Sequence, residues 1–155
     1  MDRDTTILSA KKNGLYGAID ITGKVLVEPK YETINLTSNP NIFYVSDSLS
    51  YYLIRNNIVI KNIGPKGRIE IIGLGDNFFL TKVSTKVKNS NNYSIINNIF
   101  DKEGNHYKEI KEVNVRTSIF SQQLPEGFVS IKKDKNDKPY IINIKTGKEL
   151  RNELF

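Results

Sequence analysis

The sequence has no cysteine and no tryptophan, and it contains only one histidine and one methionine. Without cysteine, the chain cannot build a disulfide scaffold, a thiolate metal site or a cysteine nucleophile. A single histidine leaves little for histidine-based acid–base catalysis. The sequence therefore predicts neither a metal nor a cofactor.

Long apolar runs are also missing. The best candidate, residues 69–74, is far shorter than the roughly 20 residues that a membrane-spanning helix requires. The polar, acidic start of the chain lacks the basic residues and the apolar run of a signal peptide. We therefore expect a soluble, cytoplasmic protein without a membrane partner.

The composition itself favours a folded β-rich domain. The 155 residues are 38% hydrophobic and 26% charged, and 23 Lys and Arg against 17 Asp and Glu give a formal net charge of +6. Val, Ile, Tyr and Phe dominate the apolar positions, and these residues are typical of strands. No long segment shows the periodicity of an amphipathic helix. These features predict an all-β fold.

A strand, a polar tip and a second strand recur along the chain, beginning at Ile7, Phe43, Phe79 and Phe128. A turn rich in Gly or Asn and a third strand follow each copy, as in antiparallel hairpins. After the first three copies comes a short apolar–polar–apolar triplet, which we interpret as a fourth strand of the same unit. The triplets are residues 34–36, 69–71 and 113–115.

This pattern predicts tandem antiparallel β-meander repeats in a single domain over residues 1–155. Units of this size cannot bury their apolar faces alone, so they must stack as in a solenoid or close as in a propeller. The last copy starts late, which indicates an insertion loop at 117–127. The approximate bounds of the four units are 5–36, 42–72, 78–115 and 128–155.

The first unit carries a motif: Tyr16-Gly17, Ile19-Asp20, Gly23-Lys24 and Pro29-x-Tyr31. It resembles the WG repeat, a bacterial β-rich repeat with Trp-Gly, an Ile/Leu-Asp pair, a turn Gly and a Pro-x-Tyr. Tyr16 stands where that family has Trp, and the match covers residues 11–34. The resemblance implies a tandem β-repeat protein of interaction or unknown function, and it implies no catalytic residue.

Each residue of the motif also has a structural interpretation. Gly17 permits a close approach of the backbone beside an aromatic ring, and Gly23 supplies a positive φ in a turn. Asp20 caps that turn by accepting a backbone N–H. We expect Tyr16 and Tyr31 to be core aromatics whose hydroxyls reach the rim of the core.

Three other segments resemble chemical sites, but a structural interpretation is the better one for each. His106 lies in a polar stretch without a partner for catalysis, so we expect a surface histidine. Residues 73–76 resemble part of a dinucleotide loop but precede a strand, so we expect a turn. Asp101, Glu103 and Asn105 have the spacing of calcium ligands with glycine in the wrong register, so we expect a hairpin turn.

Lysines gather at the tips that join the first and second strands of three units, including Lys11 and Lys12. Stacked units would place these tips on one surface, where lysines and neighbouring tyrosines suit a polyanion such as single-stranded nucleic acid. Lysines on exposed strand edges also prevent aggregation without binding anything. The candidate binding residues are Lys82, Lys86, Lys88, Lys132, Lys133, Lys135, Lys138, Tyr93 and Tyr140.

The sequence thus predicts a non-enzymatic interaction module built from WG-like repeats, which binds a protein through the hairpin tips and the loop at 117–127. The alternative is a protein that binds nucleic acid or another polyanion through the lysines. A third hypothesis is an enzyme or a carbohydrate-binding module. It is the weakest, because no set of nucleophile, base and acid can be assembled and tryptophan is absent.

Overall fold

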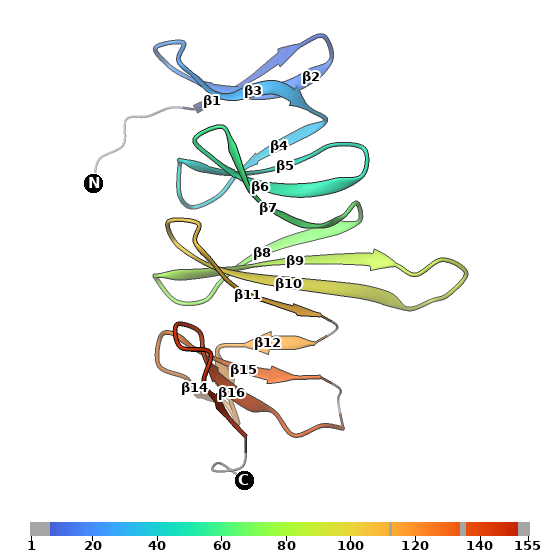
Figure 1. The fold of residues 1–155 in the computed structure, drawn as a ribbon, viewed down its shortest axis with the longest axis vertical. Helices are drawn as coiled ribbons and strands as arrows, with labels where there is room; N and C mark the ends of the chain where they lie inside the picture. Colours follow the sequence, from blue (N-terminus) through green and yellow to red (C-terminus); the bar gives the residue numbers. More distant parts are fainter. Residues whose placement is uncertain (1–6, 112, 134–135, 152–155) are drawn as a thin grey trace. The chain divides into compact units, whose positions relative to one another are not determined.

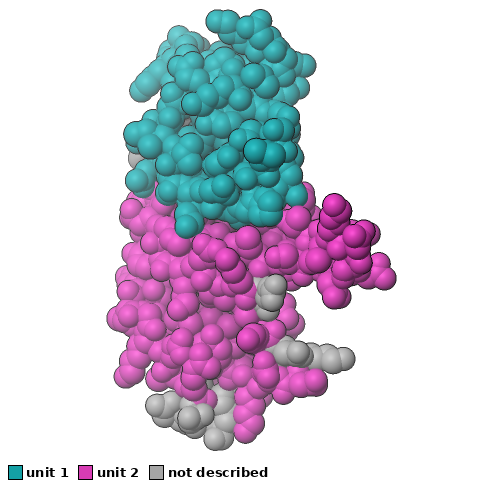
Figure 2. Space-filling view, turned by 45° about the vertical axis from the view of Figure 1, so that its right-hand side comes forward, with its two compact units in different colours: residues 1–66 teal, residues 67–155 magenta. Residues whose placement is uncertain are grey.

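The fold was analysed in a computed structural model, which describes residues 7–111, 113–133 and 136–151. The protein is all-β, with 63% strand and no helix in the described ranges, which confirms the predicted all-β class. None of the described residues therefore belongs to a helix long and apolar enough to cross a membrane. The chain divides into two compact units, unit 1 (residues 1–66) and unit 2 (residues 67–155), shown in Figure 2.

Unit 1 contains two antiparallel sheets (Figure 1). The first has the order β1-β2-β3 and the second the order β4-β5-β6-β7, so each strand pairs with its neighbours in sequence. The strands are β1 (Ile7–Lys12), β2 (Leu15–Asp20), β3 (Val25–Tyr31), β4 (Thr33–Leu36), β5 (Ile42–Ser46), β6 (Ser50–Arg55) and β7 (Ile58–Pro65).

Unit 2 contains two four-stranded antiparallel sheets and a small hairpin. The first sheet has the order β11-β10-β9-β8 and the second the order β12-β15-β16-β17, while β13 pairs only with β14. The strands are β8 (Arg68–Gly73), β9 (Phe78–Lys86), β10 (Tyr93–Asp101), β11 (His106–Lys111), β12 (Asn114–Arg116), β13 (Ser118–Ile119), β14 (Gln122–Gln123), β15 (Phe128–Lys132), β16 (Tyr140–Asn143) and β17 (Glu149–Leu150).

Strands β4, β8 and β12, which correspond to the three predicted triplets, differ from the prediction in their pairing. The prediction attached each of them to the strands before it, whereas the structure pairs each with the strand that follows. The partners are Ile34 with Val45, Ile69 with Val83 and Val115 with Ile131. An alternating pattern shows which side chains share a face, but it does not show which strand lies alongside.

Side-chain oxygens close the turn after the second strand in three of the sheets. Asp20 Oδ1 accepts hydrogen bonds from the backbone N–H groups of Thr22 (2.8 Å) and Lys24 (3.0 Å), as predicted. Asp101 and Asn143 occupy the equivalent positions in the other two sheets. Asp101 accepts hydrogen bonds from the backbone N–H groups of residues 103 and 105, and Asn143 accepts them from residues 145 and 146. Gly23 and Gly147 lie in these turns with φ of 87° and 73°, which confirms both predicted turns.

Gly17 lies at an irregularity between β2 and β3, where the strands approach closely. A Cβ atom at Gly17 would lie 2.7 Å from Pro29 N and 2.8 Å from Glu28 C, and against the carbonyl oxygen of Val27. Pro29 has no backbone N–H, so the irregular pairing leaves no donor unpaired at that position. The predicted close approach at Gly17 is confirmed.

The two motif tyrosines differ in burial. Tyr31 is 7% exposed and belongs to the core of unit 1, as predicted. Tyr16 is only half-buried, and Lys11 Nζ lies 5.2 Å from the centre of its ring, so the expectation of a core residue was wrong for Tyr16. Lys11 and Tyr16 face each other across β1 and β2, and this pairing brings the ammonium to the ring.

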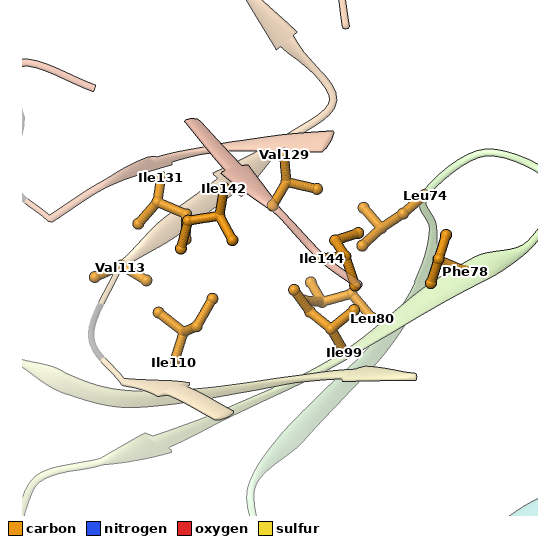
Figure 3. Close-up of a cluster of buried hydrophobic side chains, with 10 residues drawn as sticks. All are labelled: Leu74, Phe78, Leu80, Ile99, Ile110, Val113, Val129, Ile131, Ile142 and Ile144. Carbon is orange, nitrogen blue, oxygen red and sulfur yellow. The ribbon is translucent and has the colours of Figure 1, made fainter. Parts of the chain in front are cut away.

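Each unit has its own apolar core between its two sheets. In unit 1 the core consists of Ala18, Val27, Tyr31, Phe43, Val45 and Ile54. In unit 2, ten buried side chains from both sheets and their loops point toward one another (Figure 3). Side chains that point into these cores are buried, and the side chains that alternate with them along each strand point to the opposite face of the sheet.

Candidate ligand-binding cleft

The predicted insertion loop forms a small hairpin, β13–β14, in unit 2. A hydrogen bond of 2.8 Å from Leu124 N to Thr117 O closes its base. Phe120 and Ser121 form its tip, with φ of 48° and 65°. Two-residue turns with positive φ at both positions usually contain Asn or Gly, so Phe120 adopts a costly backbone conformation. Its side chain is nevertheless 75% exposed.

A cleft of about 350 Å³ lies between this hairpin and the β12–β15 edge of the sheet. Asn114 pairs with Lys132 and Arg116 pairs with Ser130, so these four side chains share one face. Val115 and Ile131 alternate with them and face the core on the other side. The cleft is lined by Asn114, Arg116, Ser118, Ile119, Phe120, Ser121, Ser130, Lys132 and Pro139.

The cleft has a positive lining. Arg116 and Lys132 contribute two cations, and no Asp or Glu is among the described lining residues. Neither cation forms an ion pair within the described part of the chain. Ser130 lies deepest of these residues, with 4% exposure. The lining therefore offers hydrogen-bond donors and positive charge beside the apolar side chains of the hairpin.

The seven candidate lysines all belong to unit 2. The turn ends of hairpins β9–β10 and β15–β16 lie on the same side of this unit (Figure 1). Lys86 and Lys88 are exposed on the first hairpin, and Lys133 and Lys138 are exposed on the second. Lys135 lies outside the described residues. These positions agree with a shared lysine surface, which stays a prediction.

Lys82 and Lys132 do not fit a single row of lysines at the hairpin tips. Lys82 is half-buried and alternates with Leu80, so it shares the core-facing side of β9. It stands opposite Glu70 and Asn97 in the neighbouring strands. Lys132 instead lines the cleft on the outer face of its sheet.

The two tyrosines named with the lysines have unequal access. Tyr93 is 58% exposed and offers its ring to solvent. Tyr140 is half-buried and packs against the core of unit 2. The guanidinium of Arg151 lies 3.8 Å from the centre of its ring, and Glu149 holds that guanidinium at 2.6 Å. Arg151 therefore already occupies a position over the ring of Tyr140 that a stacking base would need.

The remaining sequence candidates have structural roles. His106 is exposed, as predicted, with Nε2 2.7 Å from Asn98 Oδ1 and its ring 5.2 Å from that of Phe100. Asp101 closes a hairpin turn, and no cluster of three potential metal ligands exists among the described residues. Residues 74–77 form the predicted turn between β8 and β9.

Sequence analysis missed a polar cluster in unit 1. Lys66 Nζ donates a 2.9 Å hydrogen bond to Ser46 Oγ, which also lies 2.5 Å from Thr33 Oγ1. Lys66 further lies 3.9 Å from Glu32. A serine beside a lysine can serve as a nucleophile, but Ser46 is fully buried, so this pair links β5 to the turn after β7 rather than reaching a substrate.

Asp47 organises the adjacent β5–β6 turn. The backbone N–H groups of Leu49 and Ser50 donate to its carboxylate and lower its pKa. Tyr52 donates a 3.0 Å hydrogen bond to the same carboxylate, which raises the pKa of Tyr52. Burial, followed by the nearby Tyr52 and Asp47, raises the pKa of Tyr31. All three groups keep their ordinary charge states at neutral pH.

Comparison with known proteins adds no family or relative. No protein-family model matches the chain, and no curated protein matches it. The resemblance to the WG repeat therefore depends on the motif residues between Tyr16 and Tyr31 and stays a prediction.

Proposed function

We propose that this chain is a non-enzymatic binding module made of WG-like β-repeats, and that it recognises another protein through the β13–β14 hairpin and the cleft beneath it. One observation carries this proposal: Phe120 is 75% exposed at the tip of a hairpin whose backbone has positive φ. A large apolar side chain in a costly conformation with little burial contributes poorly to stability. Contact with a binding partner would explain why a phenylalanine stands at this position.

The order of the sheets supports the repeat arrangement. Three sheets each contain a leading strand (β4, β8 or β12) followed by three antiparallel strands, and the sheet of β1, β2 and β3 contains the last three of these. In this proposal each sheet is one repeat, and the repeats stack as in a solenoid or a propeller. The β13–β14 hairpin is then an insertion after the leading strand of the last sheet, where repeat proteins place recognition loops.

The composition of the cleft supports recognition of a protein. Phe and Arg are enriched at the centres of protein interfaces, where single aromatic anchors account for much of the binding energy. Phe120 and Arg116 lie together here, with Ile119 and Pro139 beside them. Covering the exposed ring of Phe120 contributes about 1.5–3 kcal/mol if it becomes fully buried.

Photo-crosslinking tests this proposal. A benzophenone amino acid is placed at Phe120, with a control at Leu49, which is 73% exposed in the β5–β6 turn of unit 1. In a lysate of the source cells, we expect a discrete, protease-sensitive adduct from position 120 only. Equal adducts from both positions, or none from position 120, would refute the proposal.

A polyanion-binding function is the second candidate, because the lysine-bearing ends of two hairpins lie on one side of unit 2. Neutralising Lys86, Lys88, Lys133 and Lys138 with glutamine should then weaken binding to a short oligothymidylate and reduce its dependence on salt. If protein binding is the function, the same variant should retain the adduct at position 120.

A further inference from the structure

We infer that the cleft beneath the β13–β14 hairpin binds an acidic segment of the partner protein, with a carboxylate between Arg116 and Lys132 and an adjacent apolar side chain against Phe120. This inference rests on the proposed protein-binding function and names the chemistry of the partner at that site.

The two cations are positioned to act on one group. Arg116 stands opposite Ser130, and Lys132 stands opposite Asn114, so Arg116 and Lys132 are diagonal neighbours on adjacent strands. Such diagonal neighbours lie roughly 7–8 Å apart, with their Cβ atoms somewhat closer, which leaves room for a carboxylate between two long side chains. Arginine also offers a planar fork that matches a carboxylate.

Among the described residues that line the cleft, no side chain compensates its positive charge. Like charges on neighbouring strands destabilise a sheet, and an acidic residue nearby would normally offset the repulsion. No acidic side chain is among the described lining residues, and neither cation has an ion-pair partner within the described ranges. An incoming carboxylate supplies that missing charge.

Neutral donors surround the same position. The cleft is lined by the amide of Asn114 and by the hydroxyls of Ser118, Ser121 and Ser130. Ser130 is 4% exposed, and Lys132 is half-buried, so both lie in partly desolvated surroundings. Charge-assisted hydrogen bonds are stronger there than at a fully exposed surface.

The hairpin supplies the apolar wall. Ile119, Phe120 and Pro139 are the apolar side chains among the residues that line the cleft. Positive φ at Phe120 and Ser121 makes the tip a tight two-residue turn, so binding does not first have to order a longer loop. This arrangement suits a carboxylate followed by an apolar side chain in the ligand.

A protein segment fits these observations better than nucleic acid does. The lining has one aromatic side chain, whereas single-stranded nucleic acid is usually bound by several stacked rings along a continuous basic groove. Lys86 and Lys88 belong to a different hairpin and do not line the cleft. The cleft of about 350 Å³ has room for a few side chains.

The test uses the whole chain and a fluorescent peptide of alternating Glu and Phe, with the matching Gln–Phe peptide as the ligand control. The double variant R116Q/K132Q removes the cleft charges, and K86Q/K88Q removes the same charge from the β9–β10 hairpin of the same unit. We expect the Glu–Phe peptide to bind and the Gln–Phe peptide to bind at least tenfold more weakly. R116Q/K132Q should lose at least tenfold in affinity, as expected for one charge-assisted hydrogen bond, and K86Q/K88Q should lose less than twofold.

NMR of the unmodified chain provides a measurement that does not depend on the folding of a variant. On adding the Glu–Phe peptide, the largest shifts should occur at Arg116, Phe120 and Ser130. Absence of peptide binding, shifts centred on the β9–β10 hairpin, or equal losses in both double variants would overturn the inference. Displacement of the peptide by oligothymidylate at equal concentration would do the same in favour of nucleic acid. A protein adduct at position 120 that R116Q/K132Q leaves unchanged would retain the proposed function and reject only the acidic ligand.

Discussion

Replacing Gly17 with alanine should be among the most damaging single-methyl changes in the chain. The new Cβ atom would lie under 3 Å from Pro29 N and Glu28 C, at 2.7 Å and 2.8 Å, and against Val27 O. All three are backbone atoms of β3, so no side-chain rotation can make room. Overpacking of this kind costs about 1–3 kcal/mol, and we expect the upper end because two paired strands must separate.

Two other glycines provide matched controls for this change. Gly73 has no positive φ, and no heavy atom lies within 4 Å of the place that an alanine methyl group would take, so Gly73→Ala should change stability by less than about 0.5 kcal/mol. Gly14 has open space but a φ of 81°, so Gly14→Ala should cost about 1 kcal/mol through the backbone alone. The three variants therefore separate steric from conformational cost.

Thermal and urea unfolding followed by far-UV circular dichroism measure these differences. For a chain of this size, about 3 kcal/mol corresponds to a fall in Tm of roughly 6–12 °C for Gly17→Ala. The expected order of destabilisation is Gly17→Ala, then Gly14→Ala, then Gly73→Ala. If Gly17→Ala is no more harmful than Gly73→Ala, the close approach of β2 and β3 does not exist and the reasoning fails.

Three further predictions concern the turns and the cleft. Gly147→Val should cost about 1 kcal/mol or more, because φ is 73° there, and an unchanged urea midpoint would contradict this. Hydrogen bonds from Thr22 to Asp20, and from Leu49 and Ser50 to Asp47, lower the pKa values of the two carboxyl groups. The stabilisation that these bonds give to the folded state is therefore complete above about pH 4 and is lost as the pH falls through the folded-state pKa values. Replacing both with Asn should retain the turns, as Asn143 does, and flatten the acid limb of a pH–Tm curve; an identical acid limb would count against it. Phe120→Asn should raise the free energy of unfolding by up to about 1 kcal/mol while abolishing binding of the Glu–Phe peptide; lower stability would indicate that Phe120 is structural.

Local sequence chemistry predicted the turns well. Asp20 and Gly23 act within a few residues of each other, and their roles follow from hydrogen-bonding capacity and allowed φ values. The same applies to the all-β class, since β-branched and aromatic residues recur at strand spacing. These properties depend on neighbouring residues, so a single sequence contains the information needed.

Pairing over longer distances could not be predicted in the same way. The alternation in residues 34–36 is equally compatible with a strand before or after it, and only the fold places Ile34 beside Val45. The contact between Lys66 and Ser46 joins residues that lie far apart in the sequence, and neither residue type signals the other. The burial of Tyr31 and the partial exposure of Tyr16 likewise depend on which face of the sheet is covered.

The cleft was missed for a more specific reason. The loop at 117–127 was predicted as a recognition surface, but its hairpin was not, because β13 and β14 have only two residues each. Phe120 and Ser121 are not residues that normally indicate a turn with positive φ. Arg116 lies on β12, before the insertion, and Lys132 lies on β15, after it. Nothing in the sequence indicates the strand register that makes these two residues neighbours.

The polarity of this sheet edge determines what it can bind. Asn114, Arg116, Ser130 and Lys132 share the outer face of β12 and β15, while Val115 and Ile131 point into the core. Packing another apolar sheet onto that face would desolvate Arg116 and Lys132, which form no ion pair within the described ranges, at a cost of several kcal/mol for each. A ligand that brings its own negative charge avoids that cost. The alternation that builds the core of unit 2 on one side of these strands thus leaves, on the other side, a face suited to an acidic ligand rather than to further sheet packing.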